Sequence, residues 1–416
     1  MALSRTFMQL RPILTALRRH KVATTLIVLQ VALTLAVASN TLLIVAARVV
    51  HLSRPTGTDE PHLFVIRNGW TMGQDATQVD ANIRADLQTL RQVPGVRDAF
   101  SSQGFPLGGY NVNIVTHLKL DPDQKTAAQL VTFFASDEHA IDTLGISLVA
   151  GRNFHPDEVT ATGPSDKMDP PSIIVTRSLA DKLFPDGSAL GKTVYLPNGP
   201  AAIIGIVGSL QGPLLHGGPL DHYTVLVPMR LADPAGVNYM VRTDPTNMQP
   251  VIAAALKALQ ASAGTRIIAA QSGVVTMAQV REHAYADDHS VATLMSIVCG
   301  LLLSATAGGI VGLSSFWVSQ RRRQIGIRRS LGATTGDILR YFHTENFLIV
   351  SGGVALGALL AFYANISLME LFELPRMPLY APLLGAVVLW LLGQLAVLGP
   401  ARSAAKVPPV VVIRTE

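Results

Sequence analysis

The residues with the most distinctive chemistry form one basic segment, residues 320–333, with the sequence QRRRQIGIRRSLGA. Arginines packed this densely cannot lie in hydrocarbon, so the segment marks a boundary between membrane and water. An excess of arginine is typical of the cytoplasmic side. With helical spacing, Ile325, Arg328 and Gly332 fall on consecutive turns. The segment is therefore suited to docking a soluble protein. The alternative is that its charge only orients the neighbouring membrane helices.

Signatures of catalysis are missing from the sequence. It contains no H-E-x-x-H, C-x-x-C or G-x-S-x-G pattern. Residues 187–193, GSALGKT, resemble a Walker A loop, but three residues instead of four separate the glycines, and a strand-like sequence follows. We interpret this segment as a turn before a strand.

Metal-binding spacing is also missing. Two acidic clusters that end in histidine, residues 137–139 and 287–289, have no further ligand at a suitable distance along the chain, so we interpret them as solvated helix ends or loops. Cys299, the single cysteine, lies in an apolar stretch, and we interpret it as a packing residue.

The elements that must position the basic segment are membrane helices. The chain is 49% hydrophobic and only 15% charged, which is too apolar for an ordinary soluble protein. Four apolar stretches approach or exceed the ~17–25 residues that a spanning helix needs. We therefore expect transmembrane helices at residues 22–50, 291–318, 343–369 and 380–399, with a short extracytoplasmic loop at 370–379. The first stretch is longer than the ~7–15 residues of a signal-peptide core and lacks a clear cleavage site, so we expect it to stay in the membrane.

The distribution of charge predicts the orientation. Residues 51–290 hold 17 Lys and Arg against 23 Asp and Glu, a net charge of −6, whereas the whole chain is +5. The basic surplus lies in residues 1–21, 319–342 and 400–416, which we place in the cytoplasm together with both termini. Residues 1–21 alternate basic and apolar residues and predict an interfacial helix. No basic patch is interleaved with aromatic residues, so we expect no nucleic-acid partner.

The block 51–290 is large enough for its own core, contains no cysteine, and is expected to be an extracytoplasmic ectodomain. Its pattern predicts strand, helix and strand twice, at 63–67, 78–91 and 96–101, and at 238–242, 245–261 and 266–271. Two such units around an insertion indicate a split, ferredoxin-like α+β sheet. We assign this part to 51–118 and 228–285 and the insertion to 119–227. In the insertion we expect strands at 172–176 and 202–207 and a helix at about 177–184.

Several motifs give the chain a family resemblance. Arg321–Arg323 precede QIGIR and SLGA, and a stretch with Gly352, Gly353 and Gly357 follows. The ectodomain adds LGI at 144–146, AGRNF at 150–154, IVT at 174–176 through Ala180, LFP at 183–185, GK at 191–192 and IGIVG at 204–208. PAR at 400–402 and AA at 404–405 end the series. Together these motifs resemble the FtsX-type permease domain of ABC transporters, in particular the MacB-like class, over nearly the whole chain.

The resemblance implies four spans and an ectodomain made of a porter-like split βαβ sheet with a sabre-like insertion. It also implies a coupling helix that seats on a separate ATPase subunit. The residues expected to contact that subunit are Arg321, Arg322, Arg323, Gln324, Ile325, Gly326, Arg328, Arg329, Leu331 and Gly332. Two permeases would pair on an ATPase dimer, which would hold ATP and magnesium. This chain, which has no proper Walker A loop, would bind no cofactor and would not be an enzyme.

Two positions are of special interest within the resemblance. Gln324 stands where the family usually has Glu, and Gln cannot supply charge. We therefore hypothesise that this permease pairs with a non-identical paralogue that keeps the acid, the alternative being a second copy. Glu345 is a candidate coupling carboxylate, which we expect to cap the coupling helix or to pair with Arg340. The alternative is an interfacial carboxylate near a helix N-terminus.

The predicted spans favour mechanical work over ion-coupled transport. Gly308 with Gly312 and Gly353 with Gly357 have the G-x-x-x-G spacing that lets helices approach closely. The first, second and fourth spans carry no deep Asp, Glu, Lys or Arg, which an ion-coupled carrier needs.

Three classes of function follow. The first is a permease subunit of an ATP-driven extrusion complex in the inner membrane, working with or without a periplasmic adaptor and an outer-membrane channel. The second is a mechanotransmitter that regulates a periplasmic enzyme such as a cell-wall hydrolase. The third is a peptide-sensing subunit of a signalling complex.

Overall fold

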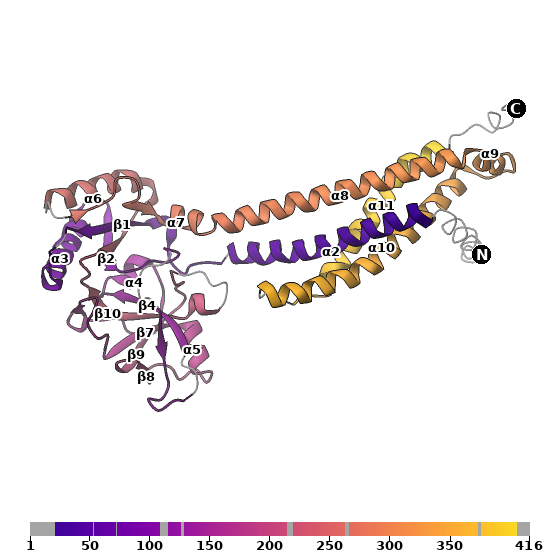
Figure 1. The fold of residues 1–416 in the computed structure, drawn as a ribbon. Helices are drawn as coiled ribbons and strands as arrows, with labels where there is room; N and C mark the ends of the chain where they lie inside the picture. Colours follow the sequence, from indigo (N-terminus) through magenta and orange to yellow (C-terminus); the bar gives the residue numbers. More distant parts are fainter. Residues whose placement is uncertain are drawn as a thin grey trace. The chain divides into compact units, whose positions relative to one another are not determined.

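The computed structural model describes residues 21–52, 54–71, 73–108, 115–125, 129–213, 219–262, 266–372 and 376–405. The chain divides into two compact units (Figure 1). We call Met1–Leu52 with Asp287–Glu416 the membrane unit, and Ser53–Ala286 the ectodomain. The interfacial helix expected at 1–21 lies outside the described residues except for Lys21, and so does the tail beyond Ala405.

The membrane unit consists of long helices and one short one. They are α2 (Lys21–Leu52), α8 (Ala286–Gln320), α9 (Arg322–Ser330), α10 (Thr335–Phe372) and α11 (Tyr380–Ala405). In the described part of the chain, α2, α8, α10 and α11 are long and apolar enough to cross a membrane. Each is longer than the stretch expected from hydropathy, because a helix continues into polar turns that an apolar window does not count.

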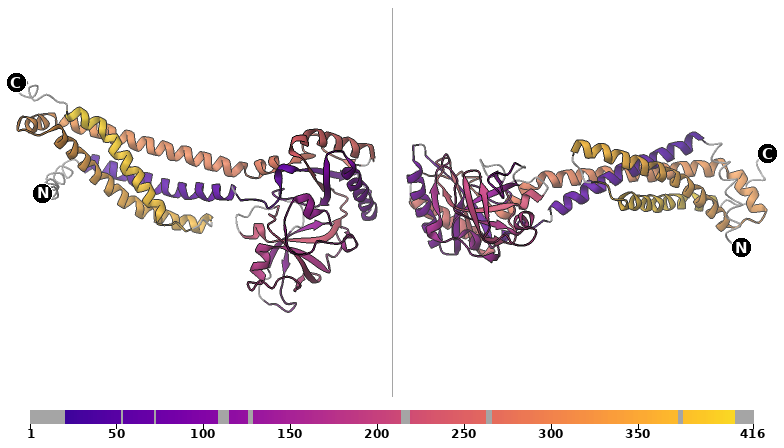
Figure 2. Two further views of the ribbon diagram at one scale, coloured as in Figure 1. Left: turned by 180° about the vertical axis from the view of Figure 1, so that it is seen from behind. Right: turned by 90° about the horizontal axis from the view of Figure 1, so that it is seen from below.

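α10 packs against both α2 and α11, and α2 also packs against α11 (Figure 2). Their shared core includes Val31 of α2, Ile349 of α10 and Leu389 of α11. One buried polar contact joins two helices of the bundle: the Thr34 and Thr306 hydroxyls lie 2.8 Å apart and link α2 to α8. Burying such groups costs little when they are paired, so they help to fix helix register.

The first sheet of the ectodomain has the strand order β12–β1–β11–β2, with β13 also pairing β1. Its elements are β1 (Leu63–Trp70), α3 (Ala76–Gln92), β2 (Val96–Ser102), β11 (Val237–Thr243), α6 (Met248–Ser262), β12 (Arg266–Ile267) and β13 (Val274–Thr276). All described pairs are antiparallel. This is the order of a ferredoxin-like split βαβ fold, so the predicted fold is confirmed. The last strand is shorter than the 266–271 expected.

One face of this sheet carries the core. Phe64 and Ile66 of β1 pack with Ile83 of α3 and with Ala255 and Leu259 of α6. Side chains alternate along a strand, so Val65 and Arg67 lie on the opposite face. That opposite face meets α4 (Ala140–Leu144), which contacts β2 and β11.

The second sheet has the order β3–β4–β10–β7–β9–β5, with β6 on β10 and β8 on β9. Its strands are β3 (Val115–Leu118), β4 (Gln129–Ser136), β5 (Leu148–Gly151), β6 (Thr160–Thr162), β7 (Ser172–Thr176), β8 (Thr193–Leu196), β9 (Gly199–Val207) and β10 (Thr224–Leu231). α5 (Arg177–Leu183) packs on it through Leu179. The sheet begins before residue 119 and ends after residue 227, so it exceeds the assigned insertion at both ends.

Short elements complete the ectodomain. They are η1 (Glu60–His62), η2 (Pro156–Glu158), η3 (Pro219–His222), η4 (Pro245–Asn247) and α7 (Met277–Ala284). Between α5 and β8, Gly187 and Gly191 have φ of +77° and +78°, which glycine adopts without strain. The Walker-like segment is thus a turn before a strand, as predicted.

Candidate functional site

The basic segment forms the short helix α9 between α8 and α10, and a defined turn ends it. Gly332 has a φ of +94°. The amide of Gly332 donates to the carbonyl of Arg329, and the amide of Ala333 donates to the carbonyl of Arg328. This is a Schellman motif, in which a left-handed glycine satisfies the last carbonyls of a helix.

α10 starts directly after that turn with a capping box. The Thr334 amide donates to the Asp337 carboxylate over 3.0 Å, and the Asp337 amide donates to Thr334 Oγ1 over 3.2 Å. The two reciprocal bonds satisfy amides that the first helical turn leaves unpaired. α9 is therefore joined to α10 by a short link with fixed geometry at both ends.

The inner face of α9 packs on the helical bundle. Ile325 is buried in one cluster with Trp317 of α8 and Phe342 of α10, and Gly326 is buried beside it. We predicted Ile325 and Gly326 as contacts of an ATPase. In the structure they face inward and hold α9 on the bundle.

A buried ion pair fixes the junction between α8 and α9. Arg321 Nη1 lies 3.0 and 3.1 Å from the two carboxylate oxygens of Glu345 and 3.4 Å from the Tyr341 hydroxyl. The side chains of Arg321 and Glu345 are only 12% and 2% exposed. The expected pairing of Glu345 with Arg340 is wrong, because residues five apart point to different sides of a helix. Arg321 is thus turned inward, away from the surface that we predicted it to form.

The outer face of α9 combines positive charge with exposed apolar side chains. Ile327 is 49% exposed and Leu331 is 82% exposed. The guanidinium of Arg328 stacks over the Tyr341 ring at 5.1 Å, which holds this side chain in place. The other predicted contacts are Arg322, Arg323, Gln324 and Gly332, which are exposed, and Arg329, which is half-buried. The exposed face of α9 thus carries both arginines and the apolar side chains of Ile327 and Leu331.

The two glycine pairs have different surroundings. A Cβ added at Gly353 would lie 2.6 Å from Cβ of Val31, and one at Gly357 would lie 2.8 Å from the carbonyl oxygen of Ala32. α10 therefore approaches α2 as closely as glycine permits. A Cβ added at Gly308 would meet nothing within 4 Å among the described residues, and Gly312 is the same. Gly308 and Gly312 therefore lie on a face of α8 that no other described helix covers.

Two segments that connect the ectodomain to the membrane helices are bound to each other. Arg281 of α7 makes two bonds of 2.7 and 2.6 Å to the Glu60 carboxylate, and it also donates to the carbonyl of Arg54 over 3.2 Å. Residues 54–60 follow α2, and α7 is followed after Tyr285 by α8. We call this pair the linker clamp.

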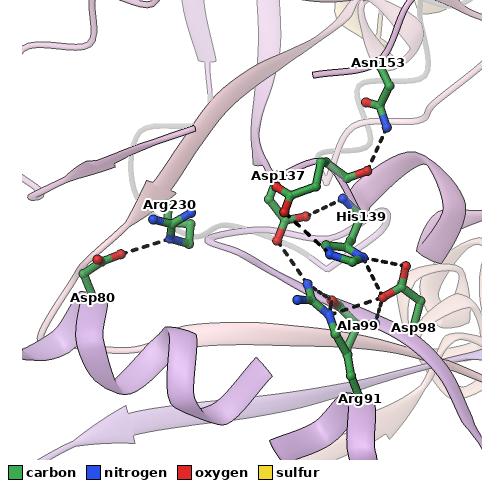
Figure 3. A network of polar contacts seen from close by, with 9 residues as sticks. Asp80, Arg91, Asp98, Ala99, Asp137, His139, Asn153 and Arg230 are labelled. Atoms are coloured by element: carbon green, nitrogen blue, oxygen red, sulfur yellow. Dashed lines mark hydrogen bonds and ion pairs between the residues drawn. The ribbon is translucent and has the colours of Figure 1, made fainter. Parts of the chain in front are cut away.

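A second polar network lies where α4 meets the first sheet (Figure 3). His139 Nδ1 lies 2.9 Å from the Asp98 carboxylate of β2. Arg91 of α3 lies 3.3 Å from Asp98 and 3.4 Å from Asp137. The Asp137 side chain is almost fully buried. We had interpreted residues 137–139 as a solvated helix end or loop. They do precede a helix, but the Asp137 side chain is buried and pairs with Arg91.

The network raises the pKa values of two of its members. Burial raises the pKa of Asp137 to about 6, although the Arg91 charge opposes the shift. The hydrogen bond to Asp98 raises the pKa of His139 above its usual value. Within the described residues, no group of three or more His, Cys, Asp or Glu side chains is placed to hold a metal ion. The contacts of the network are ion pairs and hydrogen bonds.

Sequence reasoning missed both ion-pair networks. Arg281 and Glu60 are 221 residues apart, and Arg91 and Asp137 are 46 apart, so no local pattern connects them. The capping box at Thr334 was readable in the sequence as T-x-x-D before an apolar run.

Two family models match this chain. The FtsX-like permease C-terminal model matches residues 296–409, and the MacB-like periplasmic core domain model matches residues 27–259, more than half of the chain. The chain belongs to the FtsX- and MacB-type family of ABC transporter permeases. With four apolar helices in its described residues, this permease is a membrane protein with a periplasmic domain.

Named relatives are distant. The permease is 23% identical to the uncharacterized ABC transporter permease YvrN of Bacillus subtilis, over 68% of this chain and 70% of YvrN. It is 24% identical to the macrolide export ATP-binding/permease protein MacB of Chromobacterium violaceum, over 64% of this chain and 40% of MacB. It is also 24% identical to the uncharacterized ABC transporter permease YknZ of B. subtilis, over 58% of this chain and 61% of YknZ. The chain thus spans less than half of that MacB and less than two thirds of YknZ.

Solved ectodomains are similar over about half of the chain. The periplasmic region of MacB from Actinobacillus actinomycetemcomitans is 14% identical with a TM-score of 0.35, over 56% of this chain and 97% of that one. The extracellular domain of YknZ is 17% identical with a TM-score of 0.31, over 50% of this chain and 97% of that one. The family assignment rests on the family models and not on these values.

Proposed function

We propose that this permease is the membrane subunit of an ATP-driven extrusion complex of the MacB type. It would couple ATP binding and hydrolysis on a separate ATPase subunit to movement of its own periplasmic domain. ATP and Mg²⁺ would be held by the ATPase dimer, and this chain would be neither catalytic nor cofactor-binding. Substrates would come from the periplasm or the outer leaflet, such as antibiotics, peptides or lipid-linked molecules.

One observation carries the proposal: α9 is held rigidly on its inner side and exposes apolar and cationic side chains on its outer side. Ile325 anchors it on the bundle, while Leu331 is 82% exposed. If α9 only set the orientation of the membrane helices, it would need positive charge, but it would not need exposed apolar side chains on a helix packed against the bundle. This face fits a soluble partner with an apolar pocket and a negative rim.

In this proposal, α8 transmits movement from α9 to the ectodomain. Its 35 residues span about 50 Å at ~1.5 Å per residue, more than the ~30 Å of a bilayer core. At one end the Arg321–Glu345 pair ties it to α10, and at the other it continues from α7, whose Arg281 forms the linker clamp. Motion of α9 would therefore reach the ectodomain along one helix.

The complex would contain two permeases, with the termini and α9 in the cytoplasm. The open face at Gly308 and Gly312 supports a further helix packing against α8. Gln324 is exposed, as a residue at an ATPase contact must be, and it supports an unlike pair in which the paralogue supplies a carboxylate. Isolation of the complex with only one permease sequence in it would end the unlike-pair hypothesis. An adaptor and an outer-membrane channel would complete an extrusion route.

A second function keeps the same mechanics without transport. A mechanotransmitter would use the same docking face and the same α8, and its ectodomain would act on a periplasmic enzyme. Peptide sensing for a kinase is the third. The proteins that co-purify separate the three: a channel and adaptor, a hydrolase, or a kinase.

The experiment is affinity purification from native membranes with mass spectrometry and an ATPase assay. The variant Arg322→Glu/Arg323→Glu reverses two exposed charges of α9. Arg321 is left intact because its reversal would break a buried ion pair. We expect the wild type to carry a Walker-bearing ATPase and the variant to lose it.

The matched control is Arg340→Glu/Arg402→Glu, which makes the same change of charge at exposed positions of α10 and α11. It should retain the ATPase. If the wild type brings down no ATPase, or if the control loses it as readily as the α9 variant, the docking face is not on α9.

A further inference from the structure

An opening lies on the outer edge of β1 in the ectodomain. β13 pairs with β1 at Phe64–Ile66, and β12 pairs with it at Gly69–Trp70. Between these two pairings the chain 268–273 leaves the sheet and returns, with one bond from the Arg67 amide to the Gly273 carbonyl over 2.7 Å. Beside Arg67 the chain 268–273 therefore bulges away from the sheet edge and is held to it by this bond.

Two cavities meet at this opening. One has a volume of about 350 Å³ and the other about 500 Å³, and both are lined by Arg67 and Ser272. Small-molecule sites in proteins usually measure ~300–1,000 Å³. We call the two cavities together the Arg67 groove.

Arg67 gives the groove its charge. Its side chain is exposed, and its guanidinium stacks over the Phe105 ring at 5.5 Å. Among the described residues it forms no ion pair with a carboxylate. Most other arginines of the first sheet and its helices are paired: Arg91 with Asp98, Arg242 with Asp59 and Arg266 with Asp86. An oriented guanidinium without a carboxylate is a ready partner for an anion.

The larger cavity adds an apolar wall. Val275 lies opposite Val65 in the pairing of β13 with β1, so it shares the face of Arg67, on the side away from α3 and α6. Leu107 and Val280 line the same cavity. Leu107 has a φ of +61°, the only positive φ of a non-glycine residue in the described part of the chain. Such strained residues cluster at ligand sites.

Polar groups suited to amides line the smaller cavity. Asn238 lies opposite Arg67 in the pairing of β11 with β1, and Gln103 and Ser272 stand nearby. The smaller cavity also holds one carboxylate, Asp233, whose Oδ1 accepts from the Ala235 amide over 2.8 Å. The groove thus combines the Arg67 cation and an apolar wall with side chains that can donate and accept hydrogen bonds.

We propose that the Arg67 groove binds a short apolar carboxylate, with the carboxylate on Arg67 and the apolar part against Leu107, Val275 and Val280. An apolar peptide with a free C-terminus has this chemistry. Val280 belongs to α7, which leads through Tyr285 into α8. An effect of the bound ligand on the position of α8 rests on the proposed function. Binding of the ligand to the groove does not rest on it.

The test measures binding directly by isothermal titration calorimetry on the full chain in lipid nanodiscs. The probes are acetyl-Val-Leu with a free carboxylate, the same dipeptide as its amide, and inorganic phosphate. The carboxylate should bind about tenfold more tightly than the amide, because only it makes a charge-assisted pair. Arg67→Gln should remove that difference, and Val275→Thr should weaken both peptides.

Arg177→Gln, an exposed arginine of α5 outside the groove, is the matched control and should leave all three affinities unchanged. Equal binding of carboxylate and amide, or no binding of either, would overturn the proposal. So would binding of phosphate that depends on Arg67 while the dipeptide does not bind, since the apolar wall would then have no role. Loss of ATPase copurification does not bear on these affinities, so failure of the proposed function remains distinguishable.

Discussion

At the scale of single residues, the buried ion pair at the α8–α9 junction has the clearest consequence. Glu345→Gln leaves the Arg321 charge buried without its partner. Breaking a buried pair from one side costs about 3–5 kcal/mol. We expect a large fall in the thermal midpoint of the detergent-solubilised protein, and loss of ATPase binding as α9 comes loose.

The double variant Arg321→Gln/Glu345→Gln removes both charges and serves as the control. It should recover much of the stability lost in the single variant, because no uncompensated charge remains. Equal midpoints for the single and double variants would show that the Arg321 charge left unpaired in Glu345→Gln carries no penalty.

Asp137 predicts a dependence of stability on pH. Its pKa is raised from 3.8 to about 6 by burial, so the folded state binds this proton more tightly than the unfolded state. The stabilisation is complete below the unfolded pKa and is lost as pH rises through about 6, a change of about 3 kcal/mol. His139, whose pKa is also raised, acts in the same direction.

The matching variant is Asp137→Asn, which cannot ionise but can still accept the hydrogen bond from the His139 amide. Measured by thermal melts, it should exceed the wild type at pH 7.5 by up to about 3 kcal/mol and equal it near pH 4.5. Asp181→Asn, at an exposed position, should follow the wild type at every pH. A constant difference across the range would assign the effect to packing and not to titration.

The sequence predicted the basic helix at this scale. It did not predict which of the basic side chains faces the bundle. Arg321 lies between the last residue of α8 and the first of α9. The helical phase is interrupted there, so counting turns from either side does not assign its direction. The partner, Glu345, comes from a different helix, and only the packed bundle brings the two together.

At the scale of elements, the two glycine pairs of the membrane helices predict opposite outcomes. Gly353→Ala places a Cβ 2.6 Å from Cβ of Val31, so α10 must move away from α2. Overpacking of this kind costs about 1–3 kcal/mol. Gly308→Ala meets nothing within 4 Å in the described chain and gains helix propensity of about 1 kcal/mol.

Thermal melts of the purified permease and of the intact complex measure both variants. Gly353→Ala should lower the midpoint in either sample. Gly308→Ala should leave the isolated chain unchanged or slightly stabilised, and should weaken the complex if a second permease packs on this face. A Gly353→Ala variant as stable as the wild type would mean that α2 and α10 are not in close contact.

The pattern of elements also explains which parts of the fold were predictable. The βαβ repeat around the insertion has long amphipathic helices and strands of alternating burial, so the ferredoxin-like sheet followed from periodicity. β5 and β6 have four and three residues with few buried side chains, too short for a periodic signal. They form only because β9 and β10 present free edges to them.

At the scale of the whole molecule, the chain passes between its two units twice, at residue 53 and at residue 286. The linker clamp binds these two passages to each other, because Glu60 follows the first and Arg281 precedes the second. In the proposed function, a displacement of α8 would reach the chain that follows α2 through this ion pair and through the pair of Arg48 with Asp288. Neither Glu60 nor Arg281 belongs to a hydrophobic core of the described residues.

The last prediction concerns the orientation of the chain in the membrane. It is based on the distribution of charge along the sequence. The ectodomain block has a net charge of −6, whereas the chain as a whole is +5, so the positive surplus lies in the flanks that we predict to be cytoplasmic. Because Cys299 is the single cysteine, a Cys299→Ser background gives a clean test with a membrane-impermeant maleimide. Lys182→Cys, exposed on α5, should label in intact spheroplasts. Arg323→Cys, exposed on α9, should label only after lysis. The reverse pattern would place α9 outside, where no ATP-hydrolysing partner could reach it, and would remove the basis for coupling.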